Sequence, residues 1–207
     1  ELPVPTKEHY GFDGWYLGNE RVNNETIFNE NITLTAHWTK NRYTVTFNAG
    51  ENGTASESSL SVDSGDTLNL PSASKEGYTF NGWFTESSGG SEVTNSTPIL
   101  SSQTLYAHYT INTYTITYNS NGGSEVSPSN VTVTYGQTLT LPEPTKENYI
   151  LAGWFTESEN GTEVTNDTSI TSSMILYAHY VSAIQNFAYT VVDTFVIYPN
   201  PTTGQFT

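Results

Sequence analysis

Two stretches of the chain alternate strictly between apolar and hydroxyl side chains. In residues 43–47, Tyr, Val and Phe alternate with threonine, and residues 114–118 repeat this order with Tyr, Ile and Tyr. A period of two is typical of a strand with one buried face. Loops rich in Gly, Asn and Ser follow and predict turns. Each loop leads into a second alternating run, so each stretch is expected to begin a small sheet.

The same succession of patterns recurs along the chain: a Leu-Pro pair, a Lys-Glu-x-Tyr stretch, a Gly-Trp-aromatic segment and an Ala-His-aromatic close. Trp83 and Trp154 lie 71 positions apart, whereas Trp15 precedes Trp83 by 68 because the first copy is three residues shorter. Such a fixed period indicates a repeat protein. The chain is therefore predicted to hold the C-terminal half of a first repeat (1–40), two full repeats (41–111 and 112–181) and a segment of different character (182–207).

Each full repeat is predicted to contain four short strands, and no segment has the apolar spacing of an amphipathic helix. The predicted fold class is mainly β, with small tandem units of about 71 residues and little helix. A unit of this size is near the lower limit for independent stability, so a large aromatic anchor is expected in each. We assign this anchoring role to Trp15, Trp83, Trp154, Tyr10, Tyr78 and Tyr149. The glycine before each tryptophan is predicted to mark a bulge or a close backbone approach: Gly14, Gly82 and Gly153.

Composition agrees with β structure and excludes several classes of protein. Aromatic residues, Thr, Val and Ile, which favour strands, outweigh good helix formers. Six basic residues against 21 acidic ones give a net charge of -15, which disfavours nucleic acid and anionic lipid as partners. The absence of cysteine excludes disulfides and thiolate metal sites. No apolar run approaches the roughly 20 residues of a membrane helix, so no transmembrane segment is predicted. A signal peptide is expected to have been removed or to lie upstream.

Three histidines share one position of the repeat: His37, His108 and His179. A metal site needs several ligands in one cluster, whereas the repeats separate these side chains, so they are interpreted as residues of a strand face. His9 has no histidine counterpart in the other copies. No grouping of Ser, His and an acid recurs as in a catalytic triad. Neither catalytic residues nor a cofactor are predicted, and the chain is not expected to be an enzyme.

Two further sets of polar residues are candidate sites. Acidic loops could hold calcium, but they lack the spacing of known calcium loops and are interpreted as solvated: Glu86, Glu92, Glu157, Glu159, Glu163 and Asp167. Asn-x-Thr sequons are interpreted as a by-product of a composition rich in Asn and Thr: Asn24, Asn31, Asn52, Asn95, Asn130, Asn160 and Asn166.

The full motif reads Tyr-x-Val-x-Phe-Asn, Gly-x-x-Leu-x-Leu-Pro, Gly-Tyr-x-Phe-x-Gly-Trp-Phe and Leu-Tyr-Ala-His-Tyr. Over about 1–181 it resembles the Listeria–Bacteroides repeat, the B repeat of the internalin surface proteins. The chain departs from that pattern at Asn148, where a glycine is usual, and at Ile150-Leu151, where x-Phe is usual. The resemblance implies β-grasp-like units in tandem on secreted or surface-attached bacterial proteins. It implies roles in spacing, adhesion or surface interaction, and no catalysis.

A second resemblance lies in the C-terminal segment. The run Tyr-Pro-Asn-Pro, followed by small polar residues and a glycine, is similar to the opening of the C-terminal sorting domain of Bacteroidetes type IX secretion. The matching residues are Tyr198, Pro199, Asn200, Pro201 and Gly204. This resemblance implies export across the outer membrane, with the type IX secretion machinery as a partner. The alternative is a proline-rich linker that begins another β domain.

Two functional hypotheses follow. The leading one is a non-catalytic, tandem-repeat stalk or adhesion region of an exported bacterial cell-surface protein, spacing or presenting other domains. An adhesion role implies a cell-surface protein or a glycan as the partner. The alternative is a carbohydrate-binding array in which Trp83 and Trp154 are exposed platforms for sugar rings. The burial of these two indoles distinguishes the hypotheses.

Overall fold

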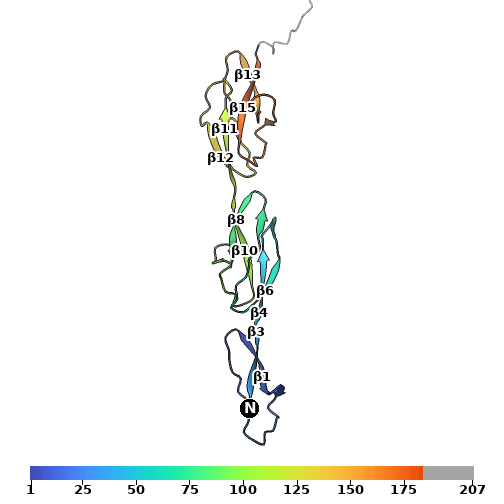
Figure 1. The fold of residues 1–207 in the computed structure, drawn as a ribbon. Coiled ribbons are helices and arrows are strands. Elements are labelled where there is room, and N and C mark those ends of the chain that lie inside the picture. The colour runs from blue at the N-terminus through green and yellow to red at the C-terminus, as the bar shows by residue number, and fades with distance from the viewer. Residues whose placement is uncertain (184–207) are drawn as a thin grey trace, which may run out of the picture. The chain divides into compact units, whose positions relative to one another are not determined.

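A computed structural model describes residues 1–183 of the chain, and the regular structure of these residues consists of strands alone (Figure 1). The mainly β fold class is therefore confirmed. The sorting motif predicted at Tyr198 to Gly204 lies outside the described residues. Residues 1–113 form one compact unit, and the described residues from Tyr114 to Ala183 belong to a second. The first partial repeat and the second repeat thus belong to the same unit.

Every repeat contains several strands. The first partial repeat contains β1 (Tyr10–Leu17), β2 (Glu20–Val22) and β3 (Thr35–Lys40). The second repeat contains β4 (Arg42–Asn48), β5 (Gly53–Ala55), β6 (Ser59–Asp63), β7 (Ala73–Lys75), β8 (Tyr78–Phe84), β9 (Glu92–Val93) and β10 (Gln103–Ile111). The third repeat contains β11 (Thr113–Asn119), β12 (Asn130–Thr134), β13 (Tyr149–Phe155), β14 (Glu163–Val164) and β15 (Met174–Ser182).

The second and third repeats build the same five-stranded mixed sheet, with strand orders β6-β4-β10-β8-β9 and β12-β11-β15-β13-β14. The first and last long strands of each repeat lie side by side and parallel, as β4 with β10 and β11 with β15. The predicted count of four strands per repeat is wrong. Strands β9 and β14 have two residues each, and β5 and β7 form a separate small sheet in the second repeat. Strands this short carry too little alternation for a pattern to reveal them.

Each full repeat has its own apolar core around one tryptophan. Trp83 and Trp154 are 1% and 2% exposed. The Phe47 ring lies 4.9 Å from that of Trp83, and the Tyr118 ring lies 5.2 Å from that of Trp154. The core of the second repeat consists of Val45, Phe47, Val62, Trp83, Val93, Ile99 and Leu105. The core of the third consists of Ile116, Tyr118, Leu139, Trp154, Val164, Ile170, Leu176 and Ala178. Ile99 in the second repeat, and Leu139 and Ile170 in the third, lie outside the strands, so loop residues complete each core.

The first partial repeat has a smaller, three-stranded sheet in the order β2-β1-β3. Its Trp15 is only partly buried. The Trp15 ring packs edge-on against Phe12 at 5.7 Å, and Phe12 in turn lies 5.3 Å from Trp38. An aromatic row thus takes the place of the full core found in the other repeats.

A bulge occurs where the glycine precedes each tryptophan. Gly14, Gly82 and Gly153 have φ angles of 136°, 145° and 152°, which side-chain-bearing residues rarely adopt. The strand pairing shifts register next to each of these glycines. Because an extra residue re-aims the side chains of a strand, the bulge sets which face the following aromatic residues occupy.

The Lys-Glu-x-Tyr stretch forms a tight turn whose third position is left-handed in every copy. His9, Gly77 and Asn148 have φ angles of 68°, 75° and 63°. Asparagine and histidine are among the non-glycine residues that tolerate this region. The departure from the family pattern at Asn148 therefore preserves the backbone conformation that glycine adopts at Gly77.

Polar bonds join the first and second repeats within residues 1–113. The Asn41 amide donates to the His9 carbonyl at 2.9 Å, and the Ser64 amide donates to the Asn41 carbonyl at 2.7 Å. His9 Nδ1 lies 2.8 Å from the hydroxyl of Ser64, which is 3% exposed. Lys40 Nζ lies 2.8 Å from Asp66, and this hydrogen bond raises the pKa of Lys40. These contacts explain why the two repeats form one compact unit.

A matched pair of tyrosines gives a prediction about buried hydroxyl groups. Tyr180 Oη donates to the Ser120 carbonyl at 3.0 Å, whereas Tyr109 Oη, at the same repeat position, is the buried side-chain atom that lacks a hydrogen-bond partner among the described residues. Burial raises the pKa of both phenols. We expect Tyr180→Phe to lower the free energy of unfolding by about 1 kcal/mol and Tyr109→Phe to leave it unchanged or raise it. Urea denaturation measures both, and equal losses in the two variants would contradict the assignment.

Candidate interaction site

A hydrogen bond from the indole holds the Leu-Pro segment of each repeat over its tryptophan. Nε1 of Trp15, Trp83 and Trp154 donates to the proline carbonyl twelve residues earlier at 2.7, 2.8 and 2.7 Å. Buried indole N–H groups usually require such a partner. The tryptophan therefore has two roles, because its ring fills the core and its nitrogen fixes the segment above it.

A second bond holds the same segment from the other side. The amides of Leu2, Leu70 and Leu141 donate to Oδ1 of an asparagine at 2.9, 3.0 and 2.9 Å; these acceptors are Asn24, Asn95 and Asn166. All three asparagines begin Asn-x-Thr sequons, and the threonine hydroxyl of each sequon accepts from the backbone amide three residues earlier. The interpretation of these three sequons as a by-product of composition is therefore wrong. Their recurrence at one repeat position was the signal that could have revealed them.

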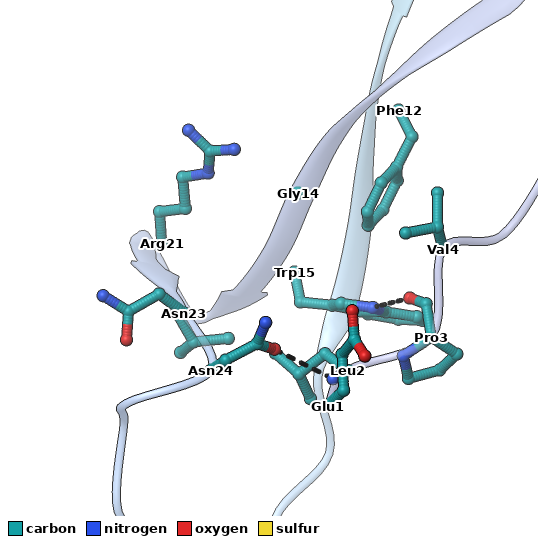
Figure 2. A pocket seen from close by; sticks show the side chains of 11 residues that line it. Glu1, Leu2, Pro3, Val4, Phe12, Gly14, Trp15, Arg21, Asn23 and Asn24 are labelled. Atoms are coloured by element: carbon teal, nitrogen blue, oxygen red, sulfur yellow. Dashed lines mark hydrogen bonds between the residues drawn. The ribbon is translucent and has the colours of Figure 1, made fainter.

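We call these two hydrogen bonds, one to the tryptophan indole and one to the asparagine side chain, the clasp. A shallow hollow adjoins the clasp in the first and third repeats. In the first repeat it measures about 410 Å³ and lies between the Leu2-Pro3 segment, Trp15 and Arg21 (Figure 2). In the third repeat the equivalent hollow measures about 230 Å³, and Glu163 takes the position of Arg21. The same surface position thus carries opposite charges in different copies.

Two of the positions that line this hollow also belong to a group of four residues that we call the outer-face spot. In the second repeat Phe84 stacks on His108 at 4.0 Å between ring centroids, and the pair lies beside Gly82 and Glu92. A Cβ atom added to Gly82 would lie 3.1 Å from Glu92 Oε1 and 3.6 Å from the Phe84 ring. Since Phe84 follows Trp83 in the strand, its side chain points away from the core.

The third repeat reproduces this spot with Phe155, His179, Gly153 and Glu163. The rings stack at 4.2 Å, and a Cβ atom on Gly153 would lie 3.1 Å from Glu163 Oε1. In both repeats the histidine Nε2 lies 2.9 Å from a loop carbonyl, that of Glu86 or Glu157. A carbonyl only accepts hydrogen bonds, so Nε2 carries the proton and Nδ1 is an acceptor when the ring is neutral.

The predicted tyrosine anchors lie at the turn and not in the core. Tyr149 is 46% exposed, and Tyr10 and Tyr78 are partly buried. Each ring lies under the lysine three residues earlier, with Nζ-to-centroid distances of 4.0 Å for Tyr10, 4.6 Å for Tyr78 and 5.0 Å for Tyr149. These cation–π contacts brace the turn.

The repeat histidines lie on three different strands: His37 on β3, His108 on β10 and His179 on β15. Within residues 1–183 no three His, Asp or Glu side chains gather in a group that could hold a metal ion. No helix among the described residues is long and apolar enough to cross a membrane.

Comparison with known proteins matches this architecture to one family. The model of the Listeria-Bacteroides repeat domain matches residues 1–37, 43–108 and 114–179. A presumed membrane protein of Evansella cellulosilytica is 36% identical over 90% of this chain, and a presumed Gly-rich membrane protein of the same organism is 34% identical over 85%. Internalin H of Listeria monocytogenes is 37% identical over 54%. The chain spans 28%, 21% and 21% of the length of these relatives. It belongs to the Listeria-Bacteroides repeat family, of which it carries one partial and two full copies in tandem.

Proposed function

We propose that the chain is a non-catalytic stalk or adhesion region of an exported bacterial cell-surface protein. The observation that carries this proposal is the recurrence of one unit, closed in every copy by its own Trp–Pro and Leu–Asn bonds. Repeated units in series present whatever they carry at a distance set by their number. The names of the relatives, two presumed membrane proteins and an internalin, support a location at the cell envelope.

The export route in this proposal rests on the sequence of the C-terminal segment. Tyr198-Pro199-Asn200-Pro201, with Gly204, begins a sorting domain that the type IX secretion machinery of Bacteroidetes recognises. The partner in adhesion is a cell-surface protein or a glycan. The carbohydrate array built on Trp83 and Trp154 loses its basis, because both indoles are buried and unavailable to stack on a sugar.

Deletion of one repeat in the parent protein tests the spacer role. With an epitope tag placed before residue 1, removal of residues 112–181 is expected to bring the tag closer to the cell surface by up to about 30 Å. This is the length of the nine-residue strand β15 at about 3.3 Å per residue. Electron cryotomography of gold-labelled cells measures the distance. A second copy of residues 41–111 in the deleted position should restore it.

Two results would contradict the proposal. An unchanged tag distance after deletion of the repeat would contradict the spacer role. Removal of residues 182–207 is expected to abolish surface display, so continued display on intact cells would contradict the type IX route. The two measurements are independent, because the first needs only cells that display the protein.

A further inference from the structure

The first repeat fills its outer-face spot with a guanidinium group of its own. Arg21 occupies the position that holds glutamate in the other two repeats, and Figure 2 shows it beside Gly14. A Cβ atom on Gly14 would lie 2.6 Å from Arg21 Nε and 3.3 Å from Nη2. In the same spot the rings of Tyr16 and His37 stack on each other, with 3.9 Å between their centroids. The spot thus accommodates a guanidinium over the glycine, at the side of an aromatic–imidazole stack.

The second and third repeats place a carboxylate where the first has this guanidinium. Glu92 and Glu163 are exposed, and among residues 1–183 neither forms an ion pair. A carboxylate beside flat rings suits a guanidinium, which pairs with the carboxylate through two N–H groups and stacks on the rings. The chain has only 6 basic residues against 21 acidic ones, so few cations of its own compete for these positions.

We propose that the outer-face spots of the second and third repeats each bind an arginine side chain of a cationic partner protein. The guanidinium lies against Glu92 or Glu163, beside the Phe84–His108 or Phe155–His179 stack. Lysine binds more weakly, because its ammonium is a point charge that cannot stack or form a fork. This inference rests on the adhesive part of the proposed function and names the chemistry of its partner. The spacer part does not depend on it.

A titration of the 207-residue chain tests the proposal. The probe is the peptide N-acetyl-Gly-Arg-Gly-amide, with the lysine analogue for comparison, and NMR follows the amide of Gly82, the amide of Gly153 and the histidine rings. We expect saturable shifts with a dissociation constant at least about threefold lower for the arginine peptide, as for a partly exposed charge pair with a stacking contribution. Glu92→Gln should remove the response at Gly82 and leave that at Gly153, and Glu163→Gln should do the reverse. In each variant the unchanged spot of the other repeat therefore serves as an internal control for folding and binding.

A charge-matched control separates the spot from general attraction. Glu57 is exposed in the second repeat and lies outside the spot, so Glu57→Gln removes the same charge and should leave both responses intact. Equal affinity for the two peptides, or a Gly82 response that survives Glu92→Gln, would overturn the proposal. Peptide-free shifts that grow with protein concentration and vanish in Arg21→Ala would also overturn it, because the occupant would then be a second copy of the chain. None of these outcomes affects the tag distance that tests the spacer role.

Discussion

Replacement of Trp154 by alanine is expected to unfold the third repeat and to leave residues 1–113 folded. The indole is 2% exposed, packs against Tyr118 and donates to the Pro142 carbonyl. Truncation of a buried tryptophan to alanine costs about 3–5 kcal/mol. The total stability of a domain of this size is of the same order. The repeat has no disulfide to compensate for the lost free energy of unfolding, and its core is organised around this one ring.

NMR amide spectra distinguish local from global unfolding. The Trp154→Ala variant should lose the dispersed signals of residues 114–183 and keep those of residues 1–113, whereas Trp83→Ala should lose those of the second repeat. The control is Trp154→Phe, which retains a ring in the core and loses the bond to Pro142. It should remain folded with a free energy of unfolding reduced by about 1–3 kcal/mol. Simultaneous loss of both units in Trp154→Ala would show that the units do not fold separately.

The sequence predicted those parts of the fold that alternation and recurrence encode. The long strands at Tyr43, Tyr114 and the Gly-Trp segments follow from period-two patterns and from the spacing of the copies. The short strands β5, β7, β9 and β14 were missed, because two or three residues define no period. Their formation depends on the neighbouring strand that pairs with them, which is tertiary information.

The candidate sites show the same division. The special backbone at Gly82 was predicted from its place before Trp83, but the side chain that lies over it, Glu92, comes from another strand. Only the pairing register brings these residues together, and it also creates the stack of Phe84 on His108. The hydrogen bond from each Leu-Pro segment to an asparagine could have been predicted, since Asn95 and Asn166 occupy one repeat position. Composition alone does not predict this bond, because only the recurrence of the asparagine at one repeat position indicates its structural role.

Addition of a methyl group at Gly123 is expected to destabilise the third repeat, and removal of one hydroxyl group should partly reverse the effect. A Cβ atom on Gly123 would collide with Tyr180 Oη, and it would lie 2.8 Å from Tyr180 Cζ and 3.0 Å from the Thr145 carbonyl. Overpacking of this kind costs about 1–3 kcal/mol. In Gly123→Ala/Tyr180→Phe the colliding oxygen is absent and the closest remaining side-chain contact is the end of the ring, which can shift. The double variant should therefore be more stable than the sum of the single effects predicts.

The second repeat provides the matched control, because there a backbone carbonyl, and not a side chain, blocks the added methyl group. A Cβ atom on Gly53 would collide with the Ala49 carbonyl and would lie 3.1 Å from Tyr109 Oη. Tyr109→Phe removes the hydroxyl but not the carbonyl, so Gly53→Ala should stay destabilised with or without it. Urea denaturation of the four single and two double variants gives both coupling energies. We expect about 1 kcal/mol or more for Gly123 with Tyr180 and nearly none for Gly53 with Tyr109. Equal coupling in both repeats would contradict the distinction, because it would mean that the Ala49 carbonyl yields as readily as a side chain.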